Sequence, residues 1–349
     1  MTTSQAPAVP VTAGDRERIA QLVCGHMATR VISAAAALGV ADLIDPAGST
    51  AAEVAASAGT DPGATLRLLR ALAALGVLRE TQPGRFTRTG VGELLRTDRP
   101  DSMAEFVAMT TDPAMLGGWA HLGEAVRTGR EVFPATFGTS FFGHLAEHPE
   151  LSARFNAAMR QGTRLAAHVL PQAYDFGRFD TVADVGGGDG TLIAAVLTAH
   201  PGVRGLLYDT AEGLSQAEAT LAAAGVADRC ARVAGDFFAS VPAGAEAYLL
   251  KSILHDWDDE RSEVILRHIR AVIPPHGRLL IVDAVLPDVV DPRLSALGHL
   301  GDLNMLVQLG GKERTRGDFA ALLRAAGFEL ADVTSLAPAR FSLVEAVPV

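Results

Sequence analysis

The feature that most constrains the fold is a glycine-rich segment near the middle of the chain, Thr181-Val-Ala-Asp-Val-Gly-Gly-Gly-Asp-Gly-Thr191. Its first five residues predict a short buried strand, three successive glycines follow, and residues 192–199 predict an apolar helix. This order places a helix N-terminus beside a cleft, where backbone N–H groups can meet a negatively charged or carboxylate-bearing ligand. Glycine lets such a ligand approach the main chain closely. The segment therefore predicts a nucleotide-type binding loop, although it does not by itself identify the nucleotide.

Strands and helices alternate from this segment to the C-terminus. Such alternation predicts a doubly wound, mostly parallel sheet, and thus an α/β fold class of Rossmann-like type. The expected strands are 181–185, 204–208, 231–234, 247–250, 278–283, 329–334 and 341–347, and the expected helices are 190–199, 212–224, 259–272 and 316–326. Because the last two of the seven strands lie close together at the C-terminus, we expect them to form an antiparallel hairpin.

The first hundred residues predict a different, mainly helical domain. Residues 1–13 are rich in Pro, Ala and Thr and predict a flexible tail. Apolar residues then recur at threes and fours from Asp15, and residues 79–88 predict a hairpin that turns at Pro83-Gly84. Helices followed by a β-hairpin are typical of a winged-helix domain, which either binds DNA or mediates dimerisation. Ten arginines against nine acidic residues in positions 1–100 provide no strongly basic face for DNA.

Composition narrows the class of protein. A chain of 349 residues can form two or three domains with a substantial core. The net charge of −10 argues against a general attraction to nucleic acid or to an anionic membrane. The two cysteines, Cys24 and Cys230, make a disulfide framework or a cysteine-based zinc site unexpected. With neither a signal peptide nor a membrane-spanning apolar run in the sequence, we expect a cytoplasmic protein that binds neither nucleic acid nor membrane.

Residues 101–170 are expected to be helical and are rich in aromatic, methionine and histidine side chains. Most of these side chains would belong to an ordinary core. Because ligand pockets are mostly apolar with a few polar groups, we expect some of them to form a lid over an apolar organic substrate. The candidates include Trp119, Phe142, Phe155 and Met159.

Acidic residues at the strand ends indicate which nucleotide is bound. Asp209 ends the second strand and could accept hydrogen bonds from both hydroxyls of a ribose, as in many dinucleotide sites. Asp184 and Asp189 at the glycine loop would repel a pyrophosphate but suit the cationic amino-acid end of S-adenosylmethionine (SAM). Asp236 and Phe237, after the third strand, offer a carboxylate for an adenine amino group and a ring to stack on it. SAM is therefore favoured over NAD.

A histidine follows the fourth strand at the sheet edge where open α/β sheets bind ligands. This residue, His255, is a candidate general base, because a neutral imidazole can take a hydroxyl proton near neutral pH. A lone histidine is more often a packed or surface residue than a base. Asp283 ends a predicted strand and Glu313 precedes a predicted helix, and either carboxylate could fix the tautomer of the imidazole.

Three acidic residues next to this histidine raise the question of a metal site. Asp256, Asp258 and Asp259 stand at the start of a predicted helix, where acidic residues are more often caps and partners of the helix dipole than metal ligands. We therefore expect no metal.

Four motifs occur in order along the chain: Asp184-Val-Gly-Gly-Gly-Asp-Gly190, Gly235-Asp-Phe237, Lys251-Ser-Ile-Leu-His-Asp-Trp257 and Gly310-Gly-Lys-Glu-Arg-Thr315. Together they resemble the SAM-dependent O-methyltransferases of the plant caffeic acid type and their bacterial antibiotic-tailoring relatives, from about Arg16 to the C-terminus. The resemblance implies a class I methyltransferase sheet, a winged-helix-like domain that forms a homodimer, and metal-independent methylation. The acceptor would be a phenolic or hydroxyquinone hydroxyl of an aromatic secondary metabolite. The expected domains are a tail (1–13), a dimerisation domain (14–100), a helical substrate lid (101–170) and a SAM-binding catalytic domain (171–349).

The same resemblance implies roles for individual residues. His255 would be the base, supported by Asp283 and Glu313. The residues that would hold SAM are Thr163, Asp184, Gly186, Gly188, Asp209, Thr210, Asp236, Phe237, Lys251 and Ser252. Those that would face the acceptor are Trp119, Phe142, Phe155, Met159, Asp256, Asn304 and Gln308.

Two positions depart from the plant pattern. Plant members usually carry Glu where this chain has Asp283, whose side chain is shorter, and a methionine where this chain has Asn304. The plant substrate pocket is therefore not assumed.

Three alternatives remain at this point. One class of relatives keeps the fold and SAM but hydroxylates or decarboxylates a polyketide. Because His255, Asp283 and Glu313 are all present, and a proton acceptor would otherwise have no task, methylation is favoured. A winged-helix regulator with SAM as effector is disfavoured by the acidic charge and the lid-like segment. An NAD-dependent dehydrogenase is the third alternative.

Overall fold

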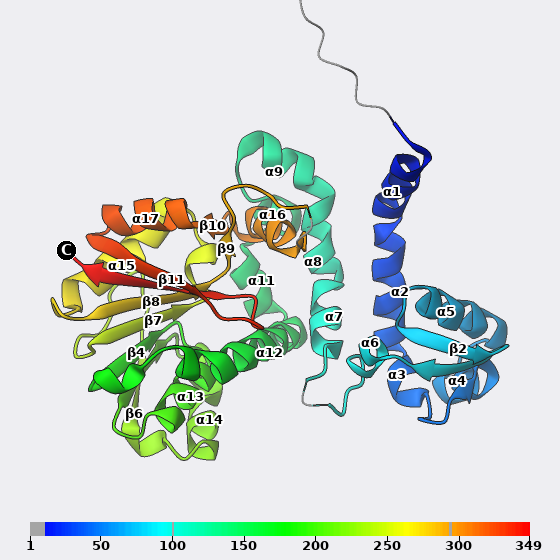
Figure 1. The fold of residues 1–349 in the computed structure, drawn as a ribbon, viewed down its shortest axis with the longest axis horizontal. Coiled ribbons are helices and arrows are strands. Elements are labelled where there is room, and N and C mark those ends of the chain that lie inside the picture. The colour runs from blue at the N-terminus through cyan, green and yellow to red at the C-terminus, as the bar shows by residue number, and fades with distance from the viewer. Residues whose placement is uncertain (1–10, 100, 293–294) are drawn as a thin grey trace, which may run out of the picture. The chain divides into compact units, whose positions relative to one another are not determined.

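The structure is a computed structural model that describes residues 11–99, 101–292 and 295–349 (Figure 1). The chain divides into two compact units, Met1–Asp112 and Pro113–Val349. Residues 101–112 thus group with the N-terminal unit. Most of the tail predicted over residues 1–13 lies outside the described residues.

The N-terminal unit combines short helices with a small antiparallel sheet. The helices are α1 (Ala13–Val23), α2 (Gly25–Ala37), α3 (Val40–Leu43), α4 (Ala51–Ala58), α5 (Pro62–Ala74), α6 (Gly90–Glu93) and α7 (Ala104–Thr110). The strands are β1 (Ser49–Thr50), β2 (Leu78–Gln82) and β3 (Arg85–Arg88), in the order β1-β3-β2. The predicted hairpin is present, and Gly84 in its turn has φ of 76°.

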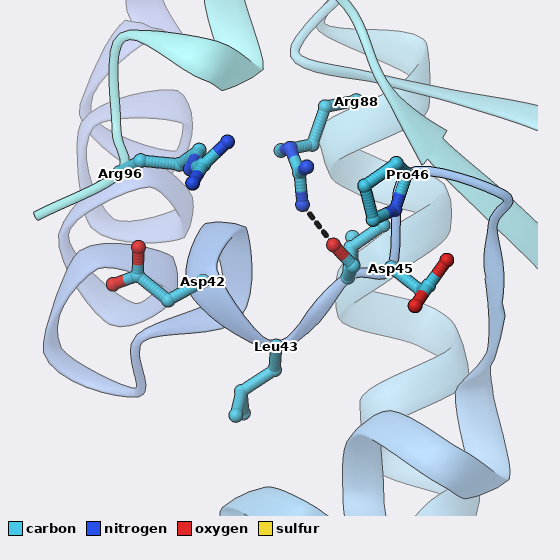
Figure 2. Close-up of a pocket in the computed structure, with 7 residues that line it drawn as sticks. Asp42, Leu43, Asp45, Pro46, Arg88 and Arg96 are labelled. Carbon is cyan, nitrogen blue, oxygen red and sulfur yellow. Dashed lines mark hydrogen bonds between the residues drawn. The ribbon is translucent and has the colours of Figure 1, made fainter. Parts of the chain in front are cut away.

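A buried arginine fixes the turn between α3 and β1. The Arg88 guanidinium donates hydrogen bonds to the backbone carbonyls of Ala41, at 2.9 Å, and Ile44. Its Nε lies 2.6 Å from Glu93 Oε1. The contact with the turn is visible in Figure 2, beside a hollow lined by Asp42, Leu43, Ile44, Asp45, Pro46, Arg88 and Arg96.

One face of α1 and the start of α2 is apolar and exposed. Its large side chains retain more than half of their accessible surface: Ile19, Leu22, Val23 and Met27. An apolar stripe of this kind marks a surface that associates with another surface.

The second unit begins with a run of helices, as expected for the lid segment. They are α8 (Pro113–Gly117), η1 (Gly118–His121), α9 (Leu122–Thr128), α10 (Phe133–Phe137), α11 (Phe141–Glu147) and the long α12 (Pro149–Ala173). None of the helices in the described parts of the chain combines the length and apolar character needed to cross a bilayer.

A seven-stranded mixed sheet follows, with the order β11-β12-β8-β7-β4-β5-β6. The strands are β4 (Thr181–Val185), β5 (Arg204–Asp209), β6 (Cys230–Ala234), β7 (Ala247–Lys251), β8 (Arg278–Asp283), β11 (Phe328–Ser335) and β12 (Ser342–Pro348). All neighbouring pairs are parallel except β8–β12 and β12–β11. The predicted fold class and the antiparallel final hairpin are therefore confirmed, with strand ends within about two residues of the expected ones.

Helices cover both faces of the sheet (Figure 1). Successive residues of a strand point to opposite faces. Val182 and Leu249 accordingly pack with α13 (Thr191–Ala199) and α14 (Ala217–Ala223), while Ala183 and Tyr248 pack with α15 (Asp259–Val272) and α17 (Arg316–Ala325). The predicted helix over 212–224 begins as a 3-10 turn, η3 (Gly213–Gln216), before α14.

Two features of this unit were not predicted. One is α16 (Leu297–Leu309), and the other is a pair of two-residue parallel strands, β9 (Val285–Leu286) and β10 (Arg314–Thr315). A short 3-10 turn, η5 (Leu254–Asp256), follows β7. These elements lie around the carboxyl ends of β7 and β8 and shape the site described next.

Candidate active site

The glycine loop between β4 and α13 is closely packed by its surroundings. A Cβ atom on Gly186 would lie 2.4 Å from Ile253 Cδ1, and one on Gly187 would lie 2.4 Å from Leu207 Cδ1. Gly186 and Gly188 also have positive φ values, 73° and 56°, which disfavour a side chain. In contrast, a Cβ on Gly188 would meet nothing within 4 Å, so the loop is open on that side.

Asp209, at the end of β5, holds this loop in place. Its Oδ2 accepts a hydrogen bond of 2.8 Å from the Gly188 N–H, and its Oδ1 accepts one of 2.6 Å from the Thr210 N–H. Because a carboxylate has about four acceptor sites, Asp209 can still bind ligand hydroxyls.

Asp184 lies beneath the loop and is almost fully buried. Burial, reinforced by the charge of Asp209, raises the pKa of Asp184 to about 7. Its Oδ2 has no hydrogen-bond partner among the described residues. The second acid of the loop segment, Asp189, is paired with Arg160 of α12 at 3.2 Å, a partner that the sequence did not predict.

The third strand end, after β6, brings Asp236 and Phe237 to the same edge. A Cβ atom on Gly186 would lie 3.6 Å from Phe237 Cε1, so this ring borders the glycine loop. Asp236 is exposed, and its Oδ1 accepts a hydrogen bond of 2.8 Å from the Phe238 N–H. These groups together fit a nucleoside with a cationic amino-acid tail. The open glycine loop and the buried carboxylate of Asp184 suit the tail, and the Phe237 ring with the carboxylates of Asp209 and Asp236 suits the nucleoside.

A lysine–threonine contact connects the sheet to α12. Lys251, the last residue of β7, donates a hydrogen bond of 3.1 Å from Nζ to Thr163 Oγ1. The Thr163 hydroxyl in turn donates to the Met159 carbonyl at 2.9 Å. Burial lowers the pKa of Lys251, although the surrounding carboxylates, Asp283 first among them, oppose this shift. The next residue, Ser252, has φ of 54° and is the one non-glycine with positive φ in the described part of the chain.

The candidate base is surrounded by three carboxylates. His255, on η5, donates from Nδ1 to Glu313 Oε1 at 3.1 Å. Asp283 Oδ1 lies 3.9 Å from the same nitrogen, which is too far for a hydrogen bond. On the other side of the ring, Nε2 lies 3.4 Å from Asp256 Oδ1. Glu313 is therefore the residue that orients the ring, and the shorter Asp283 acts on it through its charge.

These groups shift one another's pKa values. Burial alone would lower the pKa of His255, but the charges of Asp283 and Asp256 and the hydrogen bond to Glu313 raise it to about 10. Burial raises the pKa of Asp283 to about 7 and that of Asp256 to about 6, with the imidazolium opposing both shifts. The surrounding carboxylates therefore favour the charged form of the imidazole.

Of the three acids at the start of α15, one is a cap, one forms ion pairs, and Asp256 instead faces the His255 ring. Asp258 is the N-cap of α15 and accepts a hydrogen bond of 2.8 Å from the Arg261 N–H. Asp259 pairs with Lys312 and Arg314. No group of three or more His, Cys, Asp or Glu residues in the described ranges is arranged to hold a metal ion.

Two residues that the sequence did not single out hold the backbone around His255. Arg314 is buried and donates to the carbonyls of Leu254 and Trp257 at 2.7 and 3.0 Å. A Cβ atom on Gly311 would lie 2.1 Å from the His255 carbonyl oxygen, so only glycine fits there. Both belong to the motif Gly310-Gly-Lys-Glu-Arg-Thr315, and this motif is the signal in the sequence that could have identified them.

The candidate acceptor-binding residues fall into two groups. On η1 and α16, Trp119 donates from Nε1 to Asn304 Oδ1 at 3.0 Å. One turn further along α16, Gln308 is buried and donates to the Met115 carbonyl at 2.6 Å, while its Oε1 has no partner among the described residues. Gly301, on the same face of α16, lies against Glu313, since a Cβ there would be 4.0 Å from Oε1.

The second group consists of aromatic rings from the helices before the sheet. Phe142 of α11 has its ring centroid 6.0 Å from that of Trp257, next to η5. Phe155 of α12 instead packs edge-on against buried Phe141 at 5.5 Å. Phe142 is thus in contact with the segment that carries His255, whereas the Phe155 ring contact belongs to the helical core.

Comparison with known proteins identifies the family. The O-methyltransferase domain family matches residues 119–329, and the O-methyltransferase dimerisation domain matches residues 20–98. The O-demethylpuromycin O-methyltransferase of Streptomyces alboniger is 49% identical over 341 residues, which cover 96% of this chain and 90% of that protein. The chain belongs to the SAM-dependent O-methyltransferases.

Solved members of the O-methyltransferase family share the fold. The mitomycin 7-O-methyltransferase superimposes with a TM-score of 0.88 at 35% identity, covering 97% of this chain and 98% of the other. An O-methyltransferase of neocarzinostatin biosynthesis was solved with SAM and 2-hydroxy-5-methyl naphthoic acid. It superimposes with a TM-score of 0.78 at 33% identity, covering 92% of this chain and 96% of the other. SAM is therefore the cofactor, as the strand-end acids predicted.

Proposed function

We propose that this enzyme methylates a phenolic or hydroxyquinone hydroxyl of an aromatic secondary metabolite, with His255 as the general base. The observation that carries the proposal is the 3.1 Å hydrogen bond from His255 Nδ1 to Glu313. The bond keeps a proton on Nδ1, so that the ring, once it has lost its second proton above a pKa of about 10, carries its free lone pair on Nε2. No hydrogen bond occupies Nε2 among the described residues, although Asp256 lies nearby.

SAM supplies a methyl group bound to a positively charged sulfur. His255 Nε2 takes the acceptor's hydroxyl proton as the acceptor oxygen forms its bond to the methyl carbon and the carbon–sulfur bond breaks. Lys251 and the glycine loop hold the cofactor, and Asp209 binds its ribose hydroxyls. Because this transfer needs a base and an in-line arrangement but no Lewis acid, we expect activity to persist in EDTA.

The acceptor side is built for a flat, partly polar ring. Phe142 and Trp257 provide aromatic surface beside η5. The Trp119 indole fixes the amide of Asn304, so that its NH₂ group remains available to a carbonyl or hydroxyl of the acceptor. Gln308 offers an unpartnered amide oxygen on the same helix. An aromatic compound with several oxygen substituents can pack against these rings and form hydrogen bonds with the two amide groups.

We further propose that the enzyme is a homodimer through the expected dimerisation domain, residues 14–100. The exposed apolar stripe of Ile19, Leu22, Val23 and Met27 lies within or beside the matched dimerisation domain. Light scattering is expected to give twice the mass of one chain. A Leu22→Glu variant should shift the mass toward one chain, whereas an unchanged mass would place the interface elsewhere.

Mass spectrometry with methyl-labelled SAM and a panel of phenols and hydroxyquinones tests the activity. The expected product gains one labelled methyl group, and a product that gains only oxygen would support the hydroxylating class instead. His255→Ala should lower kcat by about 10²–10⁴-fold while binding of S-adenosylhomocysteine survives. His276→Ala, at an exposed histidine that also pairs with a glutamate, is the matched control. An unchanged kcat for His255→Ala would remove His255 as the base.

A further inference from the structure

The backbone on both sides of His255 is held by one buried guanidinium. Arg314 is 1% exposed. Its NH1 donates to the Leu254 carbonyl at 2.7 Å, and its NH2 donates to the Trp257 carbonyl at 3.0 Å. These two carbonyls bracket His255 and Asp256, so the arginine spans the turn that presents the imidazole.

The same guanidinium is anchored to the start of α15. Asp259 Oδ1 accepts from Nε at 3.0 Å and from NH2 at 2.9 Å, and Ser262 Oγ lies 3.0 Å from NH2. Ser262 also donates to the Leu254 carbonyl at 3.3 Å. Arg314 therefore connects η5 to a long helix of the core. Its charge is neutralised by Asp259, which lies outside the His255 cluster.

The segment that contains Arg314 contacts His255 in three ways. The Glu313 side chain orients the ring, the Arg314 side chain binds the neighbouring carbonyls, and the Gly311 backbone lies against the His255 peptide. Glu313 immediately precedes β10 and Arg314 begins it, and the side chains of consecutive residues in an extended segment point to opposite sides. Ring and backbone are thus fixed by one short stretch of chain.

The chain needs such support because it leaves β7 in an unfavourable conformation. Ser252 has φ of 54°, a left-handed conformation that is costly for a residue with a side chain. A conformation of this kind persists where surrounding contacts determine it, and it is common at functional sites. The turn after Ser252 is short, so its geometry depends on contacts from outside.

We propose that Arg314 is a positioning residue that sets the placement of His255 through the carbonyls of Leu254 and Trp257. The proposal rests on the proposed function of His255 as the base. Lysine cannot replace the arginine, because one ammonium group cannot bind both carbonyls and Asp259 in the fixed geometry of a guanidinium. A displacement of about 1 Å at a reacting group can cost about 10²-fold in rate.

Kinetics of Arg314→Lys, with the acceptor found in the product screen, test the proposal. We expect kcat to fall about 10–100-fold, with the KM for SAM and the affinity for S-adenosylhomocysteine within about threefold of the wild type. Arg324→Lys, at an exposed position of α17, is the matched control and should leave both constants unchanged.

A double-mutant cycle separates positioning from general structural damage. If Arg314 acts through His255, then Arg314→Lys should change the residual rate of His255→Ala by less than about twofold, because the group it positions is absent. An equal loss in both backgrounds would overturn the proposal and leave His255 as the base. A fully active His255→Ala would overturn the base and the positioning role together.

A milder variant covers the case in which Arg314→Lys does not fold. Asp259→Asn keeps the shape of the anchor but removes its charge, and Asp259 is half exposed, so folding should survive. We expect kcat to fall about 3–10-fold in the wild-type background and not at all in the His255→Ala background. A folded Asp259→Asn with wild-type kcat would contradict the proposal.

Discussion

Replacing Glu313 with glutamine should move the pKa of His255 downward. The hydrogen bond of 3.1 Å to His255 Nδ1 is charge-assisted, and glutamine keeps an acceptor oxygen but loses the charge. Such bonds contribute about 1.5–3 kcal/mol to stability, against about 0.5–1.5 for neutral ones, so the difference is about 1–2 kcal/mol. Since one pKa unit corresponds to about 1.4 kcal/mol, the pKa should fall by about one unit. The direction follows because the carboxylate stabilises the imidazolium, whose pKa is about 10 in the intact cluster.

The titration can be followed without an acceptor. NMR of ¹³C-labelled histidines reports the protonation of each ring, and the His255→Ala spectrum identifies the relevant signal among ten histidines. In kinetics, the rising limb of kcat/KM against pH should move to lower pH by the same amount. Glu246→Gln is the matched control, because Glu246 pairs with exposed His276 and should not affect His255.

The result that would refute this reasoning is a His255 signal whose pKa stays within about 0.3 units of the wild type, or rises. Either would mean that the Glu313 charge does not stabilise the imidazolium.

The remaining predictions concern the glycine loop and the N-terminal unit. Asp209→Ala should weaken binding of S-adenosylhomocysteine by about 10–100-fold in calorimetry, since it removes a charged acceptor and frees the Gly188 N–H; unchanged affinity would contradict the assignment. Arg88→Met should make the β3 amides exchange with deuterium faster than in the wild type, because it removes the hydrogen bonds from Arg88 to the Ala41 and Ile44 carbonyls together with the ion pair to Glu93. Arg70→Met, which breaks an exposed pair with Glu80, should change this exchange much less, and equal effects would refute the distinction.

The sheet was predictable because each strand is marked by a pattern in its own short stretch of sequence. Continuous apolar runs bounded by glycine and acidic residues located β4 and β8 at their observed ends, and the Asp209 position followed from the strand it terminates. His255 and Glu313 are separated by 58 residues. The predicted strand 247–250 placed His255 at the carboxyl edge of the sheet, whereas the role of Glu313 beside it was implied by the resemblance to the family.

The sequence could not predict contacts between side chains from distant segments, because these contacts depend on the tertiary structure. The contacts of Arg314 join three segments, and nothing in the composition of its surroundings distinguishes a buried arginine from an exposed one. The pairing of Arg160 with Asp189 is equally distant in sequence. Helix α16 was missed because its own apolar residues and glycines are spread around the whole helix. The sequence therefore shows no clear helical period.

The order of the elements has a consequence for how such an enzyme can diversify. The side chains proposed for SAM come mainly from strand ends that are fixed by the sheet, whereas most of those proposed for the acceptor come from η1, α11 and α16, outside the sheet. Substitutions on these helices can change the accepted ring with little cost to sheet stability or cofactor affinity. A duplicated gene could therefore acquire a new acceptor by small steps, each of which leaves a folded protein that still binds SAM.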